Sequence, residues 1–381
     1  MQHDPHILHV FPSFEIGGAQ RRTAALLNGG FSEFRHSILA LDKNYEAIEL
    51  INSTRQNVFA LTDLEFPKSN MIKAGFQARK HLKAIQPDLL VTYNWGSVEW
   101  NLANMAMPVC PMIHIQDGFG VEEQQTELSR RIRTRRQAYR KCNTVIVPSK
   151  TLYETADKSW FITPSKTKYI PNGIHTDRFQ AAPDAECMQQ YGLSKQDFIV
   201  GTVAALRPEK NLSKLIEAFS IFRQNIPSDT ERTAKLVIVG NGNERDRLKQ
   251  ITHDLNIENH VVFTGMLDRP ERILAAFDLY ALTSKTEQMP ISVIEAMASG
   301  LPIVSTKVGD VPSMVSSENS SLITGHAATA IARNLKLLYD NPDIGKEIGA
   351  KNRNKAQETF SFDTMLAAYE NCFAAAISKP H

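Results

Sequence analysis

Short apolar runs alternate with longer amphipathic stretches along the chain. In the first half, the runs that fit strands are His6–Phe14, Phe34–Leu41, Asp88–Tyr93, Val109–Ile115 and Thr144–Pro148. In the second half they are Phe198–Leu206, Lys235–Val239, Val261–Thr264, Leu279–Thr283, Pro302–Thr306 and Ser321–Thr324. Alternation of strands with helices is typical of α/β proteins, in which helices cover both faces of parallel sheets. A turn-rich segment, YIPNGIHTDRF at Tyr169–Phe179, separates the two groups, so we expect two sheets.

Composition narrows the class of protein. A chain of 381 residues is long enough for two domains, and 42% hydrophobic with 22% charged residues is typical of a globular protein. The net charge of +2 gives no argument for nucleic-acid binding. Four cysteines without a C-x-x-C pair argue against a zinc site or a disulfide framework and fit a reducing compartment. The N-terminal residues contain no basic segment followed by a long apolar one, so we expect a cytoplasmic protein without a signal peptide or membrane-spanning helix.

The segment Ser284–Pro312 carries the most specific chemistry. Pro290 suits the first turn of a helix, an apolar stripe follows at helical spacing, and Gly300 suits its end. Glu287 then lies in the loop before this helix and Glu295 lies on it.

The start of this helix suits an anion next to a sugar. The backbone N–H groups of Ile291, Ser292 and Val293, with the helix dipole behind them, favour a phosphate group. The carboxylates of Glu287 and Glu295 can accept hydrogen bonds from sugar hydroxyls. Either glutamate alone is more often a solvated side chain, so the combination carries the hypothesis of a sugar-phosphate ligand.

At these residues the chain resembles the retaining glycosyltransferases of family 4, also called glycosyl transferases group 1. That family carries two glutamates in text like E-G-x-P-x-x-x-x-E-A-M-A-x-G-x-P. The chain reads Glu287-Gln288-Met289-Pro290 and then EAMASGLP from Glu295, with Gln288 in place of the family's glycine.

The resemblance implies an α/β protein with the GT-B fold, which has two Rossmann-like domains, a cleft between them and a C-terminal helix that crosses back to the first domain. The acceptor-binding domain would comprise residues 1–170 with the helix at about 360–381. The nucleotide-sugar-binding domain would comprise residues 171–359. Glu295 would hold the ribose, and Glu287 would hold the donor sugar.

Several loops after strands match further motifs of the family. Gly17 and Gly18 resemble a G-G-A loop that touches the donor diphosphate and the acceptor, although a Gly-Gly pair alone is more often plain turn geometry. Gly240 belongs to a G-x-G loop that is a poor dinucleotide fingerprint, because Arg245 stands at the place of the third glycine. Gly265 and Met266 would line the nucleotide base.

The segment Ala204–Asn211 resembles the family's R-L-x-P-E-K element, in which an Arg and a Lys neutralise the departing nucleoside diphosphate. Lys210 matches the Lys, but Ala205 stands where the Arg is expected. Arg207 lies two residues further on, and in an extended segment it points to the same side. We therefore expect Arg207 to supply the missing charge. Without the surrounding motif, Arg207 and Lys210 would be interpreted as solvated loop residues.

Two further candidates follow the strand Val109–Ile115. The family often places a His before a glycine at the donor sugar, and here Asp117 occupies that place, with His114 three residues earlier. Either side chain could hydrogen-bond a sugar or acceptor hydroxyl. A His at a strand end is also commonly structural.

The resemblance implies a retaining, hexosyltransferase-type enzyme that uses a nucleoside-diphosphate sugar, with UDP as the default base, in exopolysaccharide or cell-surface glycan biosynthesis. No D-x-D triad occurs, so no metal cofactor is expected. The alternatives are a nucleotide-sugar-binding protein without transfer activity and a nucleotide-sugar isomerase or epimerase. An oxidoreductase is disfavoured by the incomplete glycine motif.

The acceptor is a glycan or a lipid-linked molecule in this interpretation. Basic residues crowd the segment from Arg130 to Lys141, beside a narrow apolar face that includes Ile132 and Tyr139. A basic amphipathic helix can lie on an anionic membrane, which would give a peripheral contact with the cytoplasmic face of the inner membrane. A solvated helix face is an equal alternative.

Overall fold

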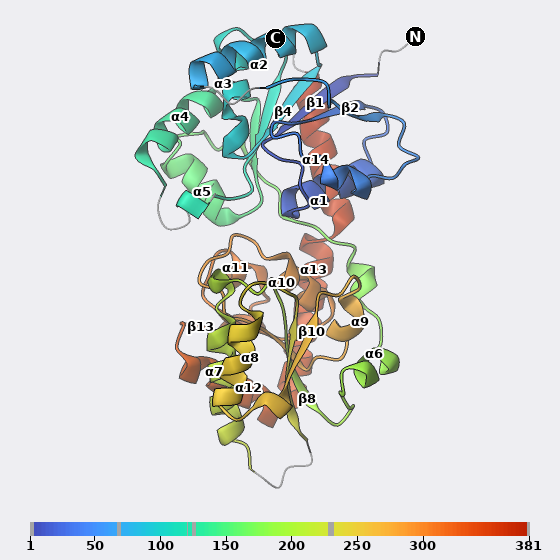
Figure 1. The fold of residues 1–381 in the computed structure, drawn as a ribbon, viewed down its shortest axis with the longest axis vertical. Helices are drawn as coiled ribbons and strands as arrows, with labels where there is room; N and C mark the ends of the chain where they lie inside the picture. The colour runs from blue at the N-terminus through green and yellow to red at the C-terminus, as the bar shows by residue number, and fades with distance from the viewer. Residues whose placement is uncertain (1–3, 67–69, 120, 124–126, 228–231, 379–381) are drawn as a thin grey trace. The chain divides into compact units, whose positions relative to one another are not determined.

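The computed structural model describes residues 4–66, 70–119, 121–123, 127–227 and 232–378. The chain forms two compact units, which we describe separately. Unit 1 comprises Met1–Asn172 and Met365–His381, and unit 2 comprises Gly173–Thr364. Each unit has one parallel sheet (Figure 1). The prediction of two parallel α/β sheets is confirmed.

Unit 1 contains a seven-stranded sheet in the order β3-β2-β1-β4-β5-β6-β7. Its strands are β1 (His6–Phe11), β2 (Arg35–Ala40), β3 (Val58–Ala60), β4 (Leu89–Tyr93), β5 (Met112–Ile115), β6 (Thr144–Val147) and β7 (Thr167–Tyr169). Its α-helices are α1 (Gly18–Gly29), α2 (Met71–Ile85), α3 (Val98–Ala106), α4 (Ser129–Arg140), α5 (Lys150–Lys158) and most of α14 (Phe362–Ile377). The strands carry the apolar runs seen in the sequence because both faces of a parallel sheet are covered.

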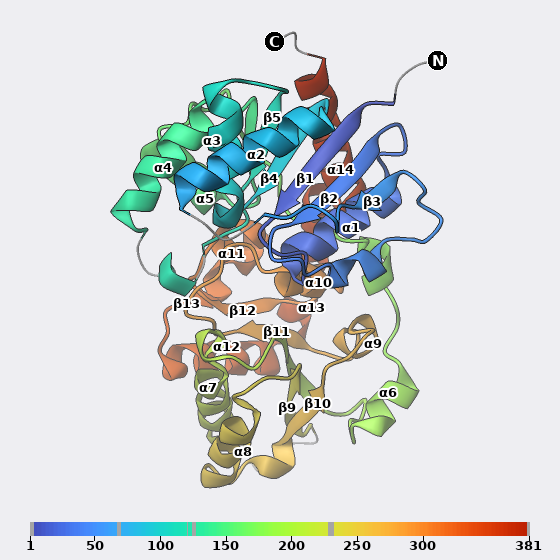
Figure 2. The same cartoon turned by 45° about the horizontal axis from the view of Figure 1, so that its top comes forward.

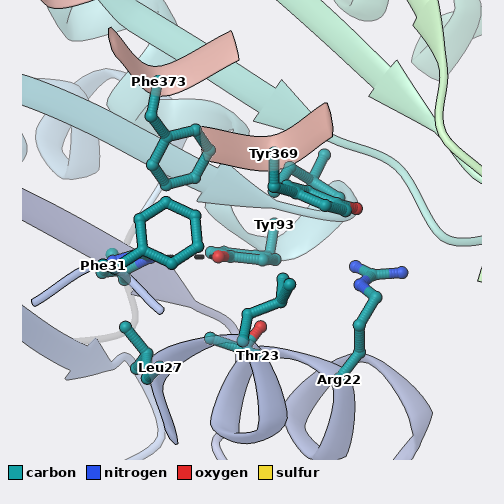
Figure 3. Close-up of a pocket in the computed structure, with 10 residues that line it drawn as sticks. Arg22, Thr23, Leu27, Phe31, Tyr93, Tyr369 and Phe373 are labelled. Carbon is teal, nitrogen blue, oxygen red and sulfur yellow. Dashed lines mark hydrogen bonds between the residues drawn. The ribbon is translucent and has the colours of Figure 1, made fainter. Parts of the chain in front are cut away.

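The two faces of this sheet bury different side chains. Leu8 and Val10 of β1 pack into a core with side chains of α2, α3, α4 and α5. His9, between them, points to the other face, because successive side chains of a strand alternate. There it lines a small enclosed cavity of about 10 Å³ with residues of α1 and α14, including Tyr369 and Phe373 (Figure 3). The expected return of the C-terminal helix to the first domain is thus observed.

Unit 2 contains a six-stranded sheet in the order β10-β9-β8-β11-β12-β13. Its strands are β8 (Phe198–Val203), β9 (Ala234–Val239), β10 (Val261–Gly265), β11 (Leu279–Leu282), β12 (Ile303–Thr306) and β13 (Ile323–Thr324). Its α-helices are α6 (Ala185–Gln190), α7 (Leu212–Gln224), α8 (Arg245–Asp254), α9 (Glu271–Leu274), α10 (Ile291–Ala298), α11 (Val311–Met314), α12 (Ala328–Asp340) and α13 (Pro342–Thr359).

Two cores lie on the two faces of the second sheet. Phe198 and Val200 of β8 pack with α7, α8 and α12. Ile199, which points the other way, packs with α9, α10 and α11. Figure 2 shows β11 and β12 running between these helix layers. Helix α10, which carries the most specific sequence motif, therefore lies directly on the sheet.

Two predicted strands end earlier than expected. β8 stops at Val203, although the apolar run continues to Leu206. Leu206 is fully buried, but its amide donates to the carbonyl of Asn241 at 2.9 Å in a loop-to-loop contact. β1 likewise stops at Phe11, directly before Pro12. The edge strands β3 and β7 were not predicted, because each has three residues and mixed exposure.

None of the helices in the described ranges has the length and apolar character needed to cross a lipid bilayer.

Candidate functional site

Lys210 and Glu287 meet in unit 2, although they are far apart in sequence. Lys210 ends a short 3-10 helix after β8, and Glu287 lies in the loop between β11 and α10. The Lys210 ammonium donates to the Glu287 carboxylate at 2.6 Å, and the Ser284 hydroxyl donates to the same oxygen at 2.7 Å. Both charged side chains remain partly exposed, at 25% and 10%. A cation and an acceptor of sugar hydroxyls therefore face solvent together.

The backbone around this pair is held firmly. The Thr283 hydroxyl lies 3.3 Å from the carbonyl of Lys210 and 3.1 Å from that of Asn211, and Asn211 adopts a left-handed conformation. Gly309 approaches the loop that carries Glu287, and a Cβ at Gly309 would lie 2.4 Å from the Glu287 carbonyl. The two loops that present Lys210 and Glu287 are thus fixed by contacts that leave the charged groups accessible.

Arg207 and Ala205 are both exposed, whereas Leu206 between them is buried. The Arg207 amide donates to the Ala205 carbonyl at 2.9 Å, which closes a tight turn. That hydrogen bond bends the backbone at Leu206, but Arg207 itself has extended backbone angles, and Ala205 and Arg207 point to the exposed side as expected. No hydrogen bond or ion pair is recorded for the Arg207 side chain among the described residues, so its guanidinium is available to a ligand.

The N-terminus of α10 has no side-chain cap, as its predicted role as an anion site requires. The Val293 amide, however, donates to the Pro290 carbonyl at 3.1 Å. This corrects the expectation of three free amides, because a tight first turn satisfies the third and leaves Ile291 and Ser292. The Ser292 hydroxyl lies 2.8 Å from that of Tyr280 on β11, which anchors the start of α10 to the sheet.

Glu295 projects from the second turn of α10 and has no recorded hydrogen-bond partner for its carboxylate within the described ranges. Burial raises the pKa of Glu295 to about 7; Arg178 opposes the rise, and Glu271 adds to it. Glu271 is itself buried and paired with Arg178 at 3.3 Å and with Arg269 at 3.1 Å. A half-buried carboxyl without a partner is an acceptor that a bound hydroxyl pair could satisfy.

The glycine loop after β9 has a structural reason for its glycines. Gly240 and Gly242 have φ of +132° and +156°, and a Cβ at either would fall 2.0 Å or 2.5 Å from the carbonyl of Ala204 or Leu206. The loop is therefore pressed against the segment that leads to Arg207. Gly240 positions that segment, and its own amide is taken by the carbonyl of Gly265 at 2.8 Å.

Gly265 and Met266 lie at the end of β10. The Gly265 carbonyl accepts from Gly240 and from the Thr264 hydroxyl, so it is already occupied. The Met266 side chain is 76% exposed. An exposed thioether beside this backbone provides an apolar surface on which a planar base could rest.

In unit 1, the loops after β1, β4 and β5 border a groove of about 520 Å³. It is lined by Gly18, Ala19, Gln20, Asn94, Trp95, Gly96, Asp117, Gly118 and Phe119. Gly17 caps α1 with an extended backbone, and a Cβ added at Gly18 would meet no atom within 4 Å. Local packing therefore does not require a glycine at position 18.

Asp117 lines this groove, but Arg22 of α1 holds its carboxylate. The two side chains form an ion pair through both carboxylate oxygens, and Arg22 is buried. Burial would lower the pKa of Arg22, but the Asp117 carboxylate raises it above its ordinary value. The guanidinium also lies 5.6 Å from the ring of Tyr369 on α14 (Figure 3). Sequence reasoning missed Arg22, which only its place one turn after the Gly-Gly pair could have indicated.

His114 is a core residue and not a site residue. Its ring is fully buried and stacks on Tyr139 with centroids 3.9 Å apart. Its two nitrogens pair with Thr92 at 2.9 Å and Gln116 at 3.2 Å. Burial lowers the pKa of His114 to about 3. The expectation that it reaches a substrate hydroxyl is wrong, because both faces of β5 are covered.

Two arginines of the basic helix α4 are paired with glutamates within unit 1. Arg135 is fully buried and pairs with Glu123 at 2.6 Å and with Glu127 at 2.9 Å. Arg131 pairs with Glu122 and Glu123, and both arginines lie 5.0 Å from the Trp95 ring. The glutamates that pair with these two arginines precede the helix, whereas Arg130, Arg133, Arg140 and Lys141 are exposed, so a membrane contact at 130–141 stays a prediction.

The described residues contain no group of three or more His, Cys, Asp or Glu side chains arranged to hold a metal ion.

Two family models match most of the chain. "Glycosyltransferase Family 4" matches residues 16–178, and "Glycosyl transferases group 1" matches residues 184–355. The chain belongs to the group 1 glycosyltransferases.

This group 1 glycosyltransferase is 28% identical over 187 residues to an N-acetyl-alpha-D-glucosaminyl L-malate synthase of Bacillus anthracis, a match that covers 49% of this chain and 47% of the relative. It is 29% identical over 169 residues to a UDP-Gal:alpha-D-GlcNAc-diphosphoundecaprenol alpha-1,3-galactosyltransferase of Escherichia coli, with 43% of each chain covered. The matches therefore span about half the length of these relatives.

Solved structures match over nearly the full length. HepE of Anabaena in complex with UDP aligns with a TM-score of 0.79 at 20% identity, covering 97% of this chain and 100% of HepE. A sucrose-phosphate synthase of Thermosynechococcus elongatus aligns with a TM-score of 0.75 at 20% identity, covering 97% of this chain and 100% of the synthase. These likenesses establish the GT-B fold of the group 1 glycosyltransferase.

Proposed function

We propose that this protein transfers a hexose or related sugar from a nucleoside-diphosphate sugar to a glycan or lipid-linked acceptor, with retention of the anomeric configuration. The bond from the anomeric carbon to the diphosphate oxygen breaks, and a bond from that carbon to the acceptor oxygen forms. The acceptor proton passes to an oxygen of the departing diphosphate. No metal ion takes part in this scheme.

The observation that carries the proposal is the convergence of Lys210 and Glu287 beside the uncapped start of α10. Negative charge develops on the departing diphosphate, so fixed positive groups lower the barrier of transfer. Lys210, Arg207 and the amides of Ile291 and Ser292 supply such groups in unit 2. Lys210 would exchange its contact with Glu287 for the diphosphate, which frees Glu287 to accept hydrogen bonds from the donor sugar.

Glu295 and Met266 complete a nucleoside site in this proposal. The unpartnered carboxylate of Glu295 accepts from the ribose hydroxyls, and the exposed side chain of Met266 lies against the base. UDP is the proposed nucleotide, because it is bound in the HepE structure and named in the Escherichia coli galactosyltransferase.

Unit 1 would bind the acceptor along the groove between Gly18 and Asp117. The ion pair with Arg22 makes Asp117 a hydrogen-bond acceptor of fixed position, so it would orient a hydroxyl and not remove its proton. The Escherichia coli relative, which is named for a sugar linked to diphosphoundecaprenol, supports a lipid-linked acceptor. Surface-glycan biosynthesis at the cytoplasmic face of a membrane is part of the proposal.

Calorimetric titration with UDP, GDP and ADP tests the site. We expect UDP to bind with the highest affinity, and Lys210→Ala and Arg207→Ala each to weaken it by at least about tenfold, since hydrogen bonds to charged groups contribute roughly 1.5 to 3 kcal/mol. Lys346→Ala, which removes an exposed lysine of α13, is the control. Binding should survive EDTA.

Turnover distinguishes transfer from the alternatives. A transferase should release UDP from UDP-sugars only when an acceptor is present. A retaining transferase should convert an axial donor into a product whose anomeric bond is also axial, as measured by NMR. Binding without release would indicate a nucleotide-sugar-binding subunit, consistent with Ala205 in place of an arginine. Conversion of the sugar without acceptor would indicate an isomerase. If neither Lys210→Ala nor Arg207→Ala changes the affinity for UDP, the proposed site is refuted.

A further inference from the structure

Helix α2 of unit 1 exposes large apolar side chains. Ile72 is 73% exposed and Phe76 is 72% exposed, and Met71 beside them is 39% exposed. Most surface apolar side chains stand singly, whereas these three occupy the first two turns of one helix. The opposite face of α2 is packed normally, with Ala74, Ala78 and Leu82 buried against the core.

The apolar residues belong to an open groove of about 330 Å³ between α2 and α3. Its lining is Met71, Ile72, Gly75, Phe76 and Arg79 from α2 and Leu102, Ala103 and Ala106 from α3. Gly75 widens the groove, because a Cβ added there would meet no atom within 4 Å. Met107, at the C-terminal end of α3, extends the same surface and is 59% exposed.

The exposed face of α2 is also basic. At 100° per residue, Lys80 and Lys83 fall within the same third of the helix surface as Ile72 and Phe76, and Lys73 borders it. The helix spans Met71–Ile85 and contains no acidic residue. Unlike Arg131 and Arg135 of α4, these three lysines have no ion pair among the described residues.

Neighbouring acidic groups do not cancel this charge on the exposed face. The backbone of Glu65 lies beside His81, with its carbonyl 3.1 Å from a ring nitrogen. His81 stacks on the buried Trp100, with ring centroids 6.3 Å apart, and lies about 180° around α2 from Ile72, so this contact is away from the apolar part of the exposed face. Glu99 of α3 is partly buried, and burial raises its pKa.

We propose that this face, which we call the α2 face (Ile72, Lys73, Phe76, Lys80 and Lys83), docks on the surface of an anionic lipid bilayer. Ile72 and Phe76 insert among the acyl chains near the headgroups, and the lysines contact lipid phosphates. A protein partner with an apolar patch would need acidic complements for three lysines, whereas an anionic membrane supplies both features. The inference deepens the proposed function, because a lipid-linked acceptor lies in a membrane.

Flotation of the full-length protein with vesicles tests the α2 face. We expect binding to vesicles of phosphatidylcholine with phosphatidylglycerol at 0.1 M salt, and at least about tenfold weaker binding to phosphatidylcholine alone. Ile72→Ser with Phe76→Ser, and separately Lys80→Glu with Lys83→Glu, should each lower binding at least about tenfold. All four side chains are exposed, so folding, checked by circular dichroism, should persist.

Matched controls come from unit 2. Leu337→Ser with Ile344→Ser alters two side chains that are 40% and 44% exposed, and Lys346→Glu with Lys351→Glu reverses two exposed charges on α13. The proposal is supported if both control variants bind vesicles as the unaltered chain does and both α2 variants lose vesicle binding. Equal binding of α2 variants and unaltered chain, or no vesicle binding at all, overturns it.

Self-association that the apolar variant abolishes, without vesicle binding, assigns the face to protein contact and also overturns the proposal. UDP affinity measured on the same samples is independent of this surface. The two proposals can therefore fail separately.

Discussion

Replacing Glu295 with Gln should stabilise the protein at alkaline pH. Burial raises the pKa of Glu295 from 4.5 to about 7, so ionising it within the fold costs free energy that the unfolded chain does not pay. At 1.36 kcal/mol per pKa unit, this rise in the pKa of Glu295 lowers the free energy of unfolding by about 3 kcal/mol at most, when the carboxyl is fully ionised. Partial exposure lowers the expected gain to about 2 kcal/mol at pH 8.

The sign of the effect follows from proton binding. Below pH 4.5 the carboxyl is protonated in both states, and the folded state loses no stability from it. As the pH rises through 7, the unfolded chain has released its proton while the fold resists release. We therefore expect Glu295→Gln to add less than about 1 kcal/mol at pH 5 and about 2 kcal/mol at pH 8.

Urea denaturation at pH 5 and pH 8 measures this difference, with Glu347→Gln on the exposed surface of α13 as the control. The same Gln variant should bind UDP at least about tenfold less tightly at pH 8, because an ionised acceptor forms stronger hydrogen bonds with ribose hydroxyls. A Gln variant with equal stability gains at both pH values would refute the assignment of a raised pKa. Gained stability with unchanged UDP affinity would refute the ribose contact.

Two further predictions concern stability. Gly240→Ala and Gly242→Ala should each destabilise the fold by about 2 kcal/mol or more in urea denaturation, because each Cβ would overlap a carbonyl, while Gly18→Ala should be tolerated. Protonation of His36 should lower the free energy of unfolding by up to about 3 kcal/mol as the pH falls from 6.5 to 4. Burial lowers the pKa of His36 to about 4, so the unfolded chain binds the proton at a higher pH than the folded chain does. His36→Gln should flatten that pH dependence of the unfolding free energy, and an unchanged slope would contradict the assignment.

The hydrogen bonds of His36 explain its resistance to protonation. The Tyr93 hydroxyl, His9, His36 and the Phe31 carbonyl form a chain with contacts of 3.0, 3.0 and 3.2 Å. Neutral rings satisfy every contact if each donates onward toward Phe31. A second proton on His36, at Nδ1, would set its N–H against the Nε2–H of His9, whereas a second proton on His9 would face the Tyr93 hydroxyl oxygen.

The sheets could be predicted from the sequence because buried parallel strands appear as continuous apolar runs. Leu89–Tyr93 is such a run and forms β4 in the centre of the first sheet. The three-residue edge strand Val58–Ala60 gives no such signal, since none of its residues is buried. The place of His114 could have been anticipated, because it stands inside the run MIHI, whose residues are all buried.

The site was harder to predict than the strands. The motif identified Glu287 and Lys210 separately, but their direct contact depends on the paths of the two loops that follow the neighbouring strands β8 and β11. The partners of the α4 arginines were also missed, because Glu123 and Glu127 reach them from outside the helical pattern. Exposed apolar residues on α2 could not be separated from core residues by spacing alone, since both follow helical periodicity.

The last helix has a consequence for the order of folding. Unit 1 receives α14 only after all of unit 2 has been synthesised, because Met365–His381 follows Gly173–Thr364 in the chain. Until then, the side of the first sheet around His9 and Phe31 lacks the cover of Tyr369 and Phe373. The emerging first unit therefore carries an uncovered apolar surface on the ribosome, and unit 2 is the first part of the chain that can complete its own core.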